Sequence, residues 1–155
     1  MKILAVKANN RRKCFEVRTR SRTFEYPYAK CSPKPGPDDG IARAFVDEEL
    51  GREGFTYLLK SGREGSVHIE QVLEFNRDPS YLRDLLAYQL TLEARKALAA
   101  SGLSKREAIR RMHTSPTQLY RLLDPARSKK SVDQLLRLLA ALGHEVQVKV
   151  LAKSA

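Results

Sequence analysis

Three serine-led capping boxes within one short stretch constrain the fold of this chain more than any other feature. They have the pattern S-x-x-E/Q and begin at Ser104, Ser115 and Ser131. In such a box the serine hydroxyl accepts a bond from the backbone N–H three residues on, and the Glu or Gln side chain reaches back to the serine N–H. Each box opens an apolar-periodic run. The sequence therefore predicts helices over residues 104–112, 115–124 and 131–142.

The connection between the first two of these helices is very short. Only His113 and Thr114 separate the first helix from the cap of the second. Helices joined in this way cross at a steep angle, as in a helix-turn-helix. Histidine tolerates the left-handed conformation that such a turn needs better than most residues do. Gly143 is expected to end the third helix as a left-handed cap.

The stretch GLSKREAIRRMHTSPTQLYRL, residues 102–122, resembles the helix-turn-helix of the lambda-repressor/Cro (XRE) family. The segment 131–143, with its close LLRLLAALG, is similar to the next helix of that family, and the resemblance covers roughly residues 82–151. The chain departs from the family pattern at His113, where glycine is usual, and at Ile109, where a small residue is usual. A terminal strand is expected where valines alternate over 146–150, which resembles the subgroup that includes antitoxins of toxin–antitoxin pairs.

The resemblance implies a sequence-specific regulator of transcription that binds double-stranded DNA as a homodimer. In this family the second helix enters the major groove, and its first residues meet base edges. Carried over by position, the base contacts are Thr117, Gln118 and Arg121, with Tyr120 contacting a phosphate or a thymine methyl. Gln118 is expected to cap its helix in the free protein and to be shared with a base on DNA. The implied phosphate contacts are Ser104, Lys105, Ser115, Arg127, Lys129 and Lys130.

The charge of the chain also points to a polyanion partner. The formal net charge of the 155 residues is +11. Residues 80–155 hold 14 Lys and Arg against 6 Asp and Glu, whereas residues 1–79 hold 15 against 12. The excess is thus concentrated in the half that carries the capping boxes, and nucleic acid is the commonest partner of such a surface. The alternative is a basic surface that only keeps the protein in solution.

The first half of the chain has the period-two alternation of strands. A strand is expected within 2–7, one hairpin over 14–28, and a second hairpin over 55–69, with the Pro- and Gly-rich loop 31–40 between the hairpins. The predicted fold class is α+β: a small antiparallel β-rich domain of unknown function, residues 1–78, followed by an all-α lambda-repressor-like domain, residues 79–155, that ends in a β-strand. A bridging helix is expected over 79–101, capped by Asp78.

The first half leaves the choice of function open. An aromatic sheet face is compatible with a platform for a partner protein, a dimerisation element or an effector pocket, but its aromatics are expected in the core: Phe15, Phe24, Tyr26, Tyr28, Phe55 and Tyr57. The main rival hypothesis is therefore an antitoxin whose first half binds a toxin while the second half represses its own operon. The terminal strand 145–151 is expected to pair either between two chains or within one chain.

Other classes of protein are not favoured. No catalytic site is expected because the three histidines are scattered and no Gly-rich phosphate loop is present. We predict no cofactor and no metal, since a zinc site from Cys14, Cys31 and His68 would need a coincidence of fold. The chain lacks clustered exposed aromatics of the kind that single-stranded RNA stacks upon. No apolar run approaches the ~18–20 residues of a membrane span, so a cytoplasmic protein without membrane contact is expected.

Overall fold

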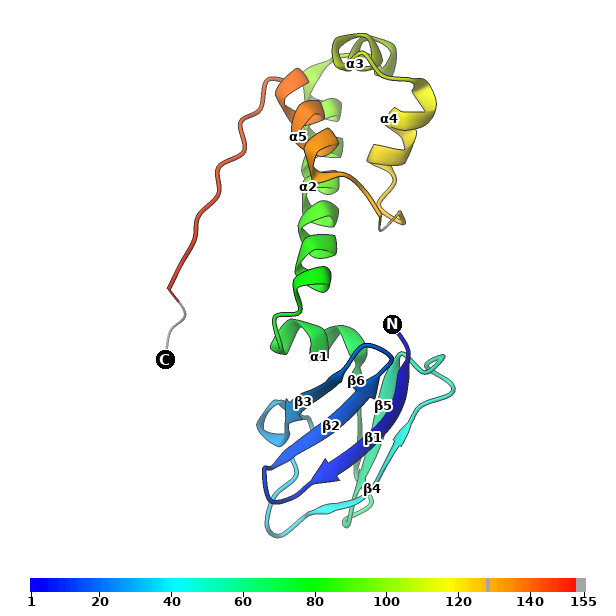
Figure 1. The fold of residues 1–155 in the computed structure, drawn as a ribbon, viewed down its shortest axis with the longest axis vertical. Helices are drawn as coiled ribbons and strands as arrows, with labels where there is room; N and C mark the ends of the chain where they lie inside the picture. The colour runs from blue at the N-terminus through cyan, green and yellow to red at the C-terminus, as the bar shows by residue number, and fades with distance from the viewer. Residues whose placement is uncertain (128, 153–155) are drawn as a thin grey trace. The chain divides into compact units, whose positions relative to one another are not determined.

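The chain divides into two compact units, Met1–Tyr81 and Leu82–Ala155, in a computed structural model that describes residues 1–127 and 129–152. The first unit holds the strands, and the second holds most of the helical residues (Figure 1). Of the helices in the described residues, none is long and apolar enough to span a membrane.

The first unit contains two antiparallel sheets of three strands each within the described residues. One sheet has the order β1 (Ile3–Asn9), β2 (Cys14–Thr19) and β3 (Thr23–Pro27). The other has the order β4 (Ile41–Val46), β5 (Gly54–Leu59) and β6 (Glu64–His68). The predicted hairpins at β2–β3 and β5–β6 are confirmed by the pairing of Phe15 with Tyr26 and of Phe55 with Val67.

A shared aromatic core joins these two sheets. Phe15 of β2 is fully buried, and its ring centroid lies 4.9 Å from that of Phe55 and 5.2 Å from that of Tyr57, both on β5. Ile3 N donates to Arg52 O at 2.8 Å and links the edge of the first sheet to the loop before β5. The expectation that the strand aromatics are core residues is therefore confirmed for these rings.

Two short helical segments belong to this first unit. The 3-10 helix η1 (Tyr28–Lys30) lies between β3 and β4, and α1 (Ile69–Phe75) follows β6 directly. His68 caps α1: its ring Nδ1 accepts from Glu70 N at 3.4 Å, and its own N–H donates to Gln71 Oε1 at 2.8 Å. Ile69 and Val72 are buried in the core between the sheets, so α1 completes that core.

The second unit is a helical cluster. Its helices are α2 (Pro79–Ser101), which begins in the first unit, α3 (Lys105–Met112), α4 (Pro116–Leu123) and α5 (Val132–Ala141). Buried leucines and alanines of all four helices form one core, with Leu119, Leu135 and Leu138 fully buried. The four helices predicted from caps and apolar period are confirmed, and so is the left-handed cap at Gly143, whose φ is +80°.

The predicted fold class was wrong. The structure is α+β with two three-stranded sheets and five α-helices in the described residues, and helical segments are interleaved with strands in the first unit. A β domain followed by an all-α domain with a terminal strand therefore does not describe it. The valines at 146, 148 and 150 belong to no strand, and Val148 and Val150 are 86 % and 88 % exposed. Alternation of apolar residues creates a strand only where another backbone offers a ladder.

Candidate nucleic-acid interface

The segment from Ser104 to Leu123 forms two short helices joined by a tight turn. Ser104 Oγ accepts from Glu107 N at 3.1 Å, and Ser115 Oγ accepts from Gln118 N at 3.2 Å. Between the helices His113 has φ 51° and ψ 46°, the left-handed conformation that ends α3. Thr114 N then donates back to Ile109 O at 3.2 Å. The chain changes direction sharply within these few residues, so α3 and α4 run in different directions (Figure 1).

One face of α4 is buried and the other is open to solvent. Leu119, Leu122 and Leu123 lie in the core of the second unit. Thr117, Tyr120 and Arg121 are exposed, at the spacing of three and four residues that places them on one face of a helix. Three of the four side chains predicted to contact bases therefore lie together on the solvent face of α4.

Tyr120 is the large side chain of this face. It is 56 % exposed, and Lys105 Nζ lies 5.0 Å from its ring centroid. A cation over the face of a tyrosine ring is attracted by the ring quadrupole. This contact brings the first residue of α3 beside the middle of α4, so two predicted DNA-contacting residues from different helices are neighbours. Beside them is an open pocket of about 650 Å³, lined by residues of α2, α3 and α4 and of the turn between α2 and α3, among them Leu98, Leu103 and Leu123.

Gln118 does not occupy the position that the sequence predicted for it. Its side-chain Nε2 donates to Gln134 Oε1 of α5 at 2.6 Å, so it neither caps α4 nor points freely to solvent. Gln118 would have to exchange this bond before it contacted a base. Glu107 likewise does not close its capping box: its carboxylate accepts from Arg110 Nη2 at 2.6 Å and from Arg111 Nε at 3.2 Å. These two hydrogen bonds hold the pKa of Glu107 down at about 2.

The basic loop before α5 places its cations in different surroundings. Lys129 is exposed, and Arg127 is exposed with its Nε 3.8 Å from Asp124 Oδ2. Lys130 is part-buried: its ammonium donates to Thr91 Oγ1 at 2.9 Å and to Leu122 O at 3.0 Å. Burial lowers the pKa of Lys130, and Asp124 offsets part of that effect. Lys130 thus ties the start of α5 to α2 and to the end of α4, a role that no sequence pattern signalled.

The cysteines show no sign of a site. Cys14 and Cys31 are free and buried, and burial raises the pKa of the Cys31 thiol to about 11. Among the described residues, no three His, Cys, Asp or Glu side chains are grouped so that they could hold a metal ion. The candidate site of the second unit is the set of cations around α3 and α4: Lys105, Arg121, Arg127 and Lys129.

Comparison with known proteins gives no relative for this site. No protein-family model matches the chain, and no curated protein and no solved structure matches it either.

Proposed function

We propose that the second unit binds double-stranded DNA and that α4 enters the major groove. The observation that carries this proposal is the solvent face of α4. Thr117, Tyr120 and Arg121 lie on it, whereas the opposite face is held in the core by three leucines. An α-helix fits the major groove, and arginine pairs there with guanine through two hydrogen bonds.

The surroundings of α4 support a phosphate-binding rim. Lys105 stands beside Tyr120, and Arg127 and Lys129 are exposed in the loop that follows α4. Ser104 and Ser115 use an oxygen lone pair to cap their helices, which leaves each hydroxyl proton free to donate to a phosphate oxygen. We leave Lys130 out of this rim because its ammonium is held by two protein acceptors.

We propose that the protein acts as a dimeric regulator of transcription. A single α4 would cover only a few base pairs, and proteins of this kind reach useful specificity by placing two recognition helices on half-sites about one helical turn apart. We propose that it binds its own upstream DNA and represses its own gene.

Fluorescence anisotropy on two duplexes tests the proposal. One duplex carries the DNA upstream of the protein's own gene and the other a scrambled sequence, each titrated across about 50 to 200 mM salt. We expect preference for the upstream duplex at the high-salt end. Arg121→Ala should reduce that preference about tenfold or more, since a good bidentate pair discriminates by about 1–3 kcal/mol. Arg137→Ala removes an equal charge from an exposed position on α5 and should keep the preference.

A loss of sequence preference would contradict the proposal. Equal, weak binding to both duplexes that disappears at high salt would mean that charge alone attracts DNA. In that case α3 and α4 would serve as a scaffold, and the proposal would fail.

A further inference from the structure

The first unit contains a pocket that the proposed DNA contacts do not use. It has a volume of about 640 Å³ and lies among the β1–β2 turn, η1, the proline-rich loop and the start of β4. A pocket of roughly 300–1,000 Å³ is typical of small-molecule sites. All of its lining residues belong to the first unit, so the pocket is complete within that unit.

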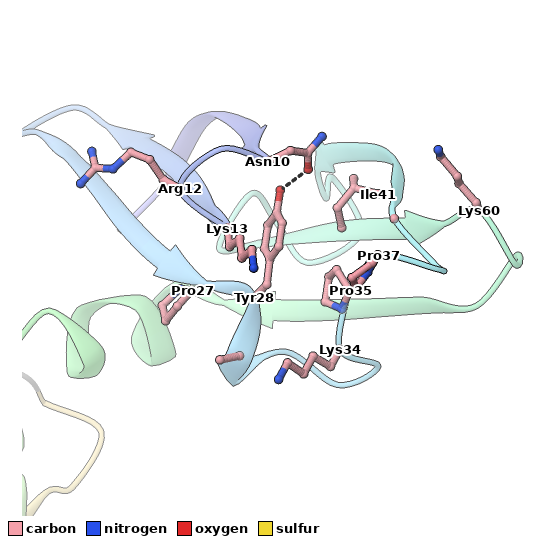
Figure 2. A pocket seen from close by; sticks show the side chains of 13 residues that line it. Asn10, Arg12, Lys13, Pro27, Tyr28, Lys34, Pro35, Pro37, Ile41 and Lys60 are labelled. Atoms are coloured by element: carbon pink, nitrogen blue, oxygen red, sulfur yellow. Dashed lines mark hydrogen bonds between the residues drawn. The ribbon is translucent and has the colours of Figure 1, made fainter.

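The inner wall of the pocket is apolar and held in place. Tyr28 is only 7 % exposed, its ring packs edge-on against Phe15 at 5.0 Å, and its hydroxyl donates to Asn10 Oδ1 at 2.9 Å. Figure 2 shows the Tyr28 ring on one side and Pro35, Pro37 and Ile41 on the other. Proline fixes its own φ, so these walls change little when a ligand enters. The apolar wall favours an apolar group of the ligand at this side of the pocket.

The rim of the pocket is positively charged. Lys34 and Lys60 extend outward at its edge, and Lys13 lies nearer the Tyr28 ring (Figure 2). None of these three lysines takes part in an ion pair of the described residues, and no carboxylate is among the lining side chains. The fourth cation, Arg12, forms an exposed ion pair with Glu25.

The proline-rich loop carries two aspartates, Asp38 and Asp39, and neither of them lines the pocket; Asp38 is exposed. Asp39 accepts from Ser61 Oγ at 2.7 Å and from Arg63 Nη2 at 2.8 Å, and these hydrogen bonds lower the pKa of Asp39 to about 2. Asp39 is thus engaged by Ser61 and Arg63, and the charged side chains that line the pocket itself are all cations.

The backbone conformation of Lys13 also bears on whether the pocket binds a ligand. Its φ is +51°, a left-handed conformation that glycine or asparagine would adopt at lower cost. Arg52 and Arg77 of the first unit share this conformation away from the pocket, so the φ of Lys13 supports a ligand site only together with its place in the pocket lining. The β1–β2 turn therefore keeps an ammonium at the pocket where a glycine would serve the turn better.

We propose that this pocket binds a small organic anion: a flat ring that packs between Tyr28 and the prolines and carries a phosphate, sulfonate or carboxylate group toward Lys13, Lys34 and Lys60. The ring supplies the apolar burial, and the anionic group pairs with the lysine rim. This site would let the first unit sense a metabolite-sized ligand, and it does not depend on whether the second unit binds DNA.

Two fluorescent probes that share their rings test the charge requirement in the full-length protein. Anilinonaphthalene sulfonate carries an anionic group, and N-phenyl naphthylamine lacks it. We expect the sulfonate to bind more tightly than the neutral probe and to shift the amide NMR resonances of Gly36 and Gly40, which line the pocket. Reversing the rim with Lys34→Glu and Lys60→Glu should weaken the sulfonate at least about tenfold and the neutral probe by less than about twofold.

Two further variants serve as controls, one for the change of net charge and one for the stability of the fold. Lys7→Glu with Arg20→Glu makes the same change of net charge at exposed positions that do not line the pocket, and it should leave both probes within about twofold of the wild type. Lys13→Gly should weaken the sulfonate while the melting temperature stays level or rises, because glycine suits the left-handed position.

Three results would overturn the proposal. The two probes could bind equally, the rim reversal could leave the sulfonate unaffected, or the shifted amides could lie away from Gly36 and Gly40. Competition distinguishes the source of the anion. Adenosine monophosphate should displace the sulfonate, whereas displacement only by a short DNA duplex would assign the lysine rim to nucleic acid and refute a small-molecule site.

Discussion

Two adjacent lysines, Lys129 and Lys130, offer a direct test of the arrangement around α4. Both were predicted from the sequence to contact phosphate. In the structure Lys129 is exposed, whereas the Lys130 ammonium donates to Thr91 Oγ1 and to the Leu122 carbonyl at 2.9 and 3.0 Å. Replacing each by methionine keeps the apolar stem and removes only the charge and the donors.

The expected magnitudes follow from these contacts. A hydrogen bond from a charged donor contributes about 1.5–3 kcal/mol, and Lys130 makes two of them from a site that is only part-buried. Taking the low end for each bond and allowing for the desolvation that methionine avoids, Lys130→Met should lower the free energy of unfolding by about 2 kcal/mol. Lys129→Met should change it by less than about 0.5 kcal/mol, as is usual for an exposed substitution.

Two measurements separate the roles. Urea unfolding followed by the helical circular dichroism signal reports on the second unit, because most helical residues lie there. The slope of log K against log salt for duplex DNA reports on phosphate contacts, and removal of one contact reduces it by about one. Lys130→Met should lower the urea midpoint and keep the slope, whereas Lys129→Met should keep the midpoint and reduce the slope.

The opposite pattern would refute this reasoning. If Lys130→Met unfolded at the wild-type urea concentration and gave a shallower salt slope, its ammonium would be free in solution. The two contacts that join α5 to α2 and α4 would then not exist in the native protein.

Three further predictions concern local features. The pKa of Glu107 is lowered from 4.5 to about 2, so its ion pairs stabilise the fold fully above pH 4.5 and are lost as the pH falls through about 2; Glu107→Gln should remove this part of the acid dependence in pH-jump unfolding. Gly65→Ala should cost about 1–3 kcal/mol in thermal unfolding, since a Cβ there would meet the Tyr57 ring and approach Ser32 O to 2.7 Å. His113→Gly should stabilise by up to about 1 kcal/mol, because φ at His113 is +51°, and the idea fails if the urea midpoint falls.

The positions of the helices could be predicted because their signals are local. Ser104, Ser115 and Ser131 each accept a hydrogen bond from the N–H three residues on, at 3.1, 3.2 and 3.3 Å. Such a bond depends only on neighbours in the chain. The left-handed turn at His113 was predictable for the same reason.

The side chains that complete the boxes could not be predicted, because other residues, distant in one case and on the same helix in the other, compete for them. Gln118 was expected to return a bond to its cap but donates to Gln134, sixteen positions away. The carboxylate of Glu107 is taken by two arginines of its own helix. A capping box thus predicts the helix start, but competing partners decide where its Glu or Gln points: a tertiary partner for Gln118 and same-helix arginines for Glu107.

In the first unit, too, some elements could be predicted from the local sequence and others could not. The β2–β3 hairpin follows from strict alternation, but α1 begins with the imidazole of His68 as its cap, which is not among the preferred cap residues. In β4 a bulge between Ile41 and Arg43 breaks the alternation, so the period-two pattern that marks a strand is missing. The valines of 146–150 have that pattern without a ladder. Periodicity describes which side chains could share a face, and only a partner backbone makes the strand.

Some cations of the second unit are bound by other groups of the protein, and the others are not. Arg110 and Arg111 are paired with Glu107, Arg127 lies near Asp124, and Lys130 is held by the fold. Six cations of the described residues from 82 onward take part in no ion pair and in no hydrogen bond to the protein: Lys105, Arg106, Arg121, Lys129, Arg137 and Lys149. Four of the six lie on α3, on α4 or in the loop that follows α4. The proposed contact with a phosphate backbone requires cations beside the helix that enters the groove, and this distribution places four of them there.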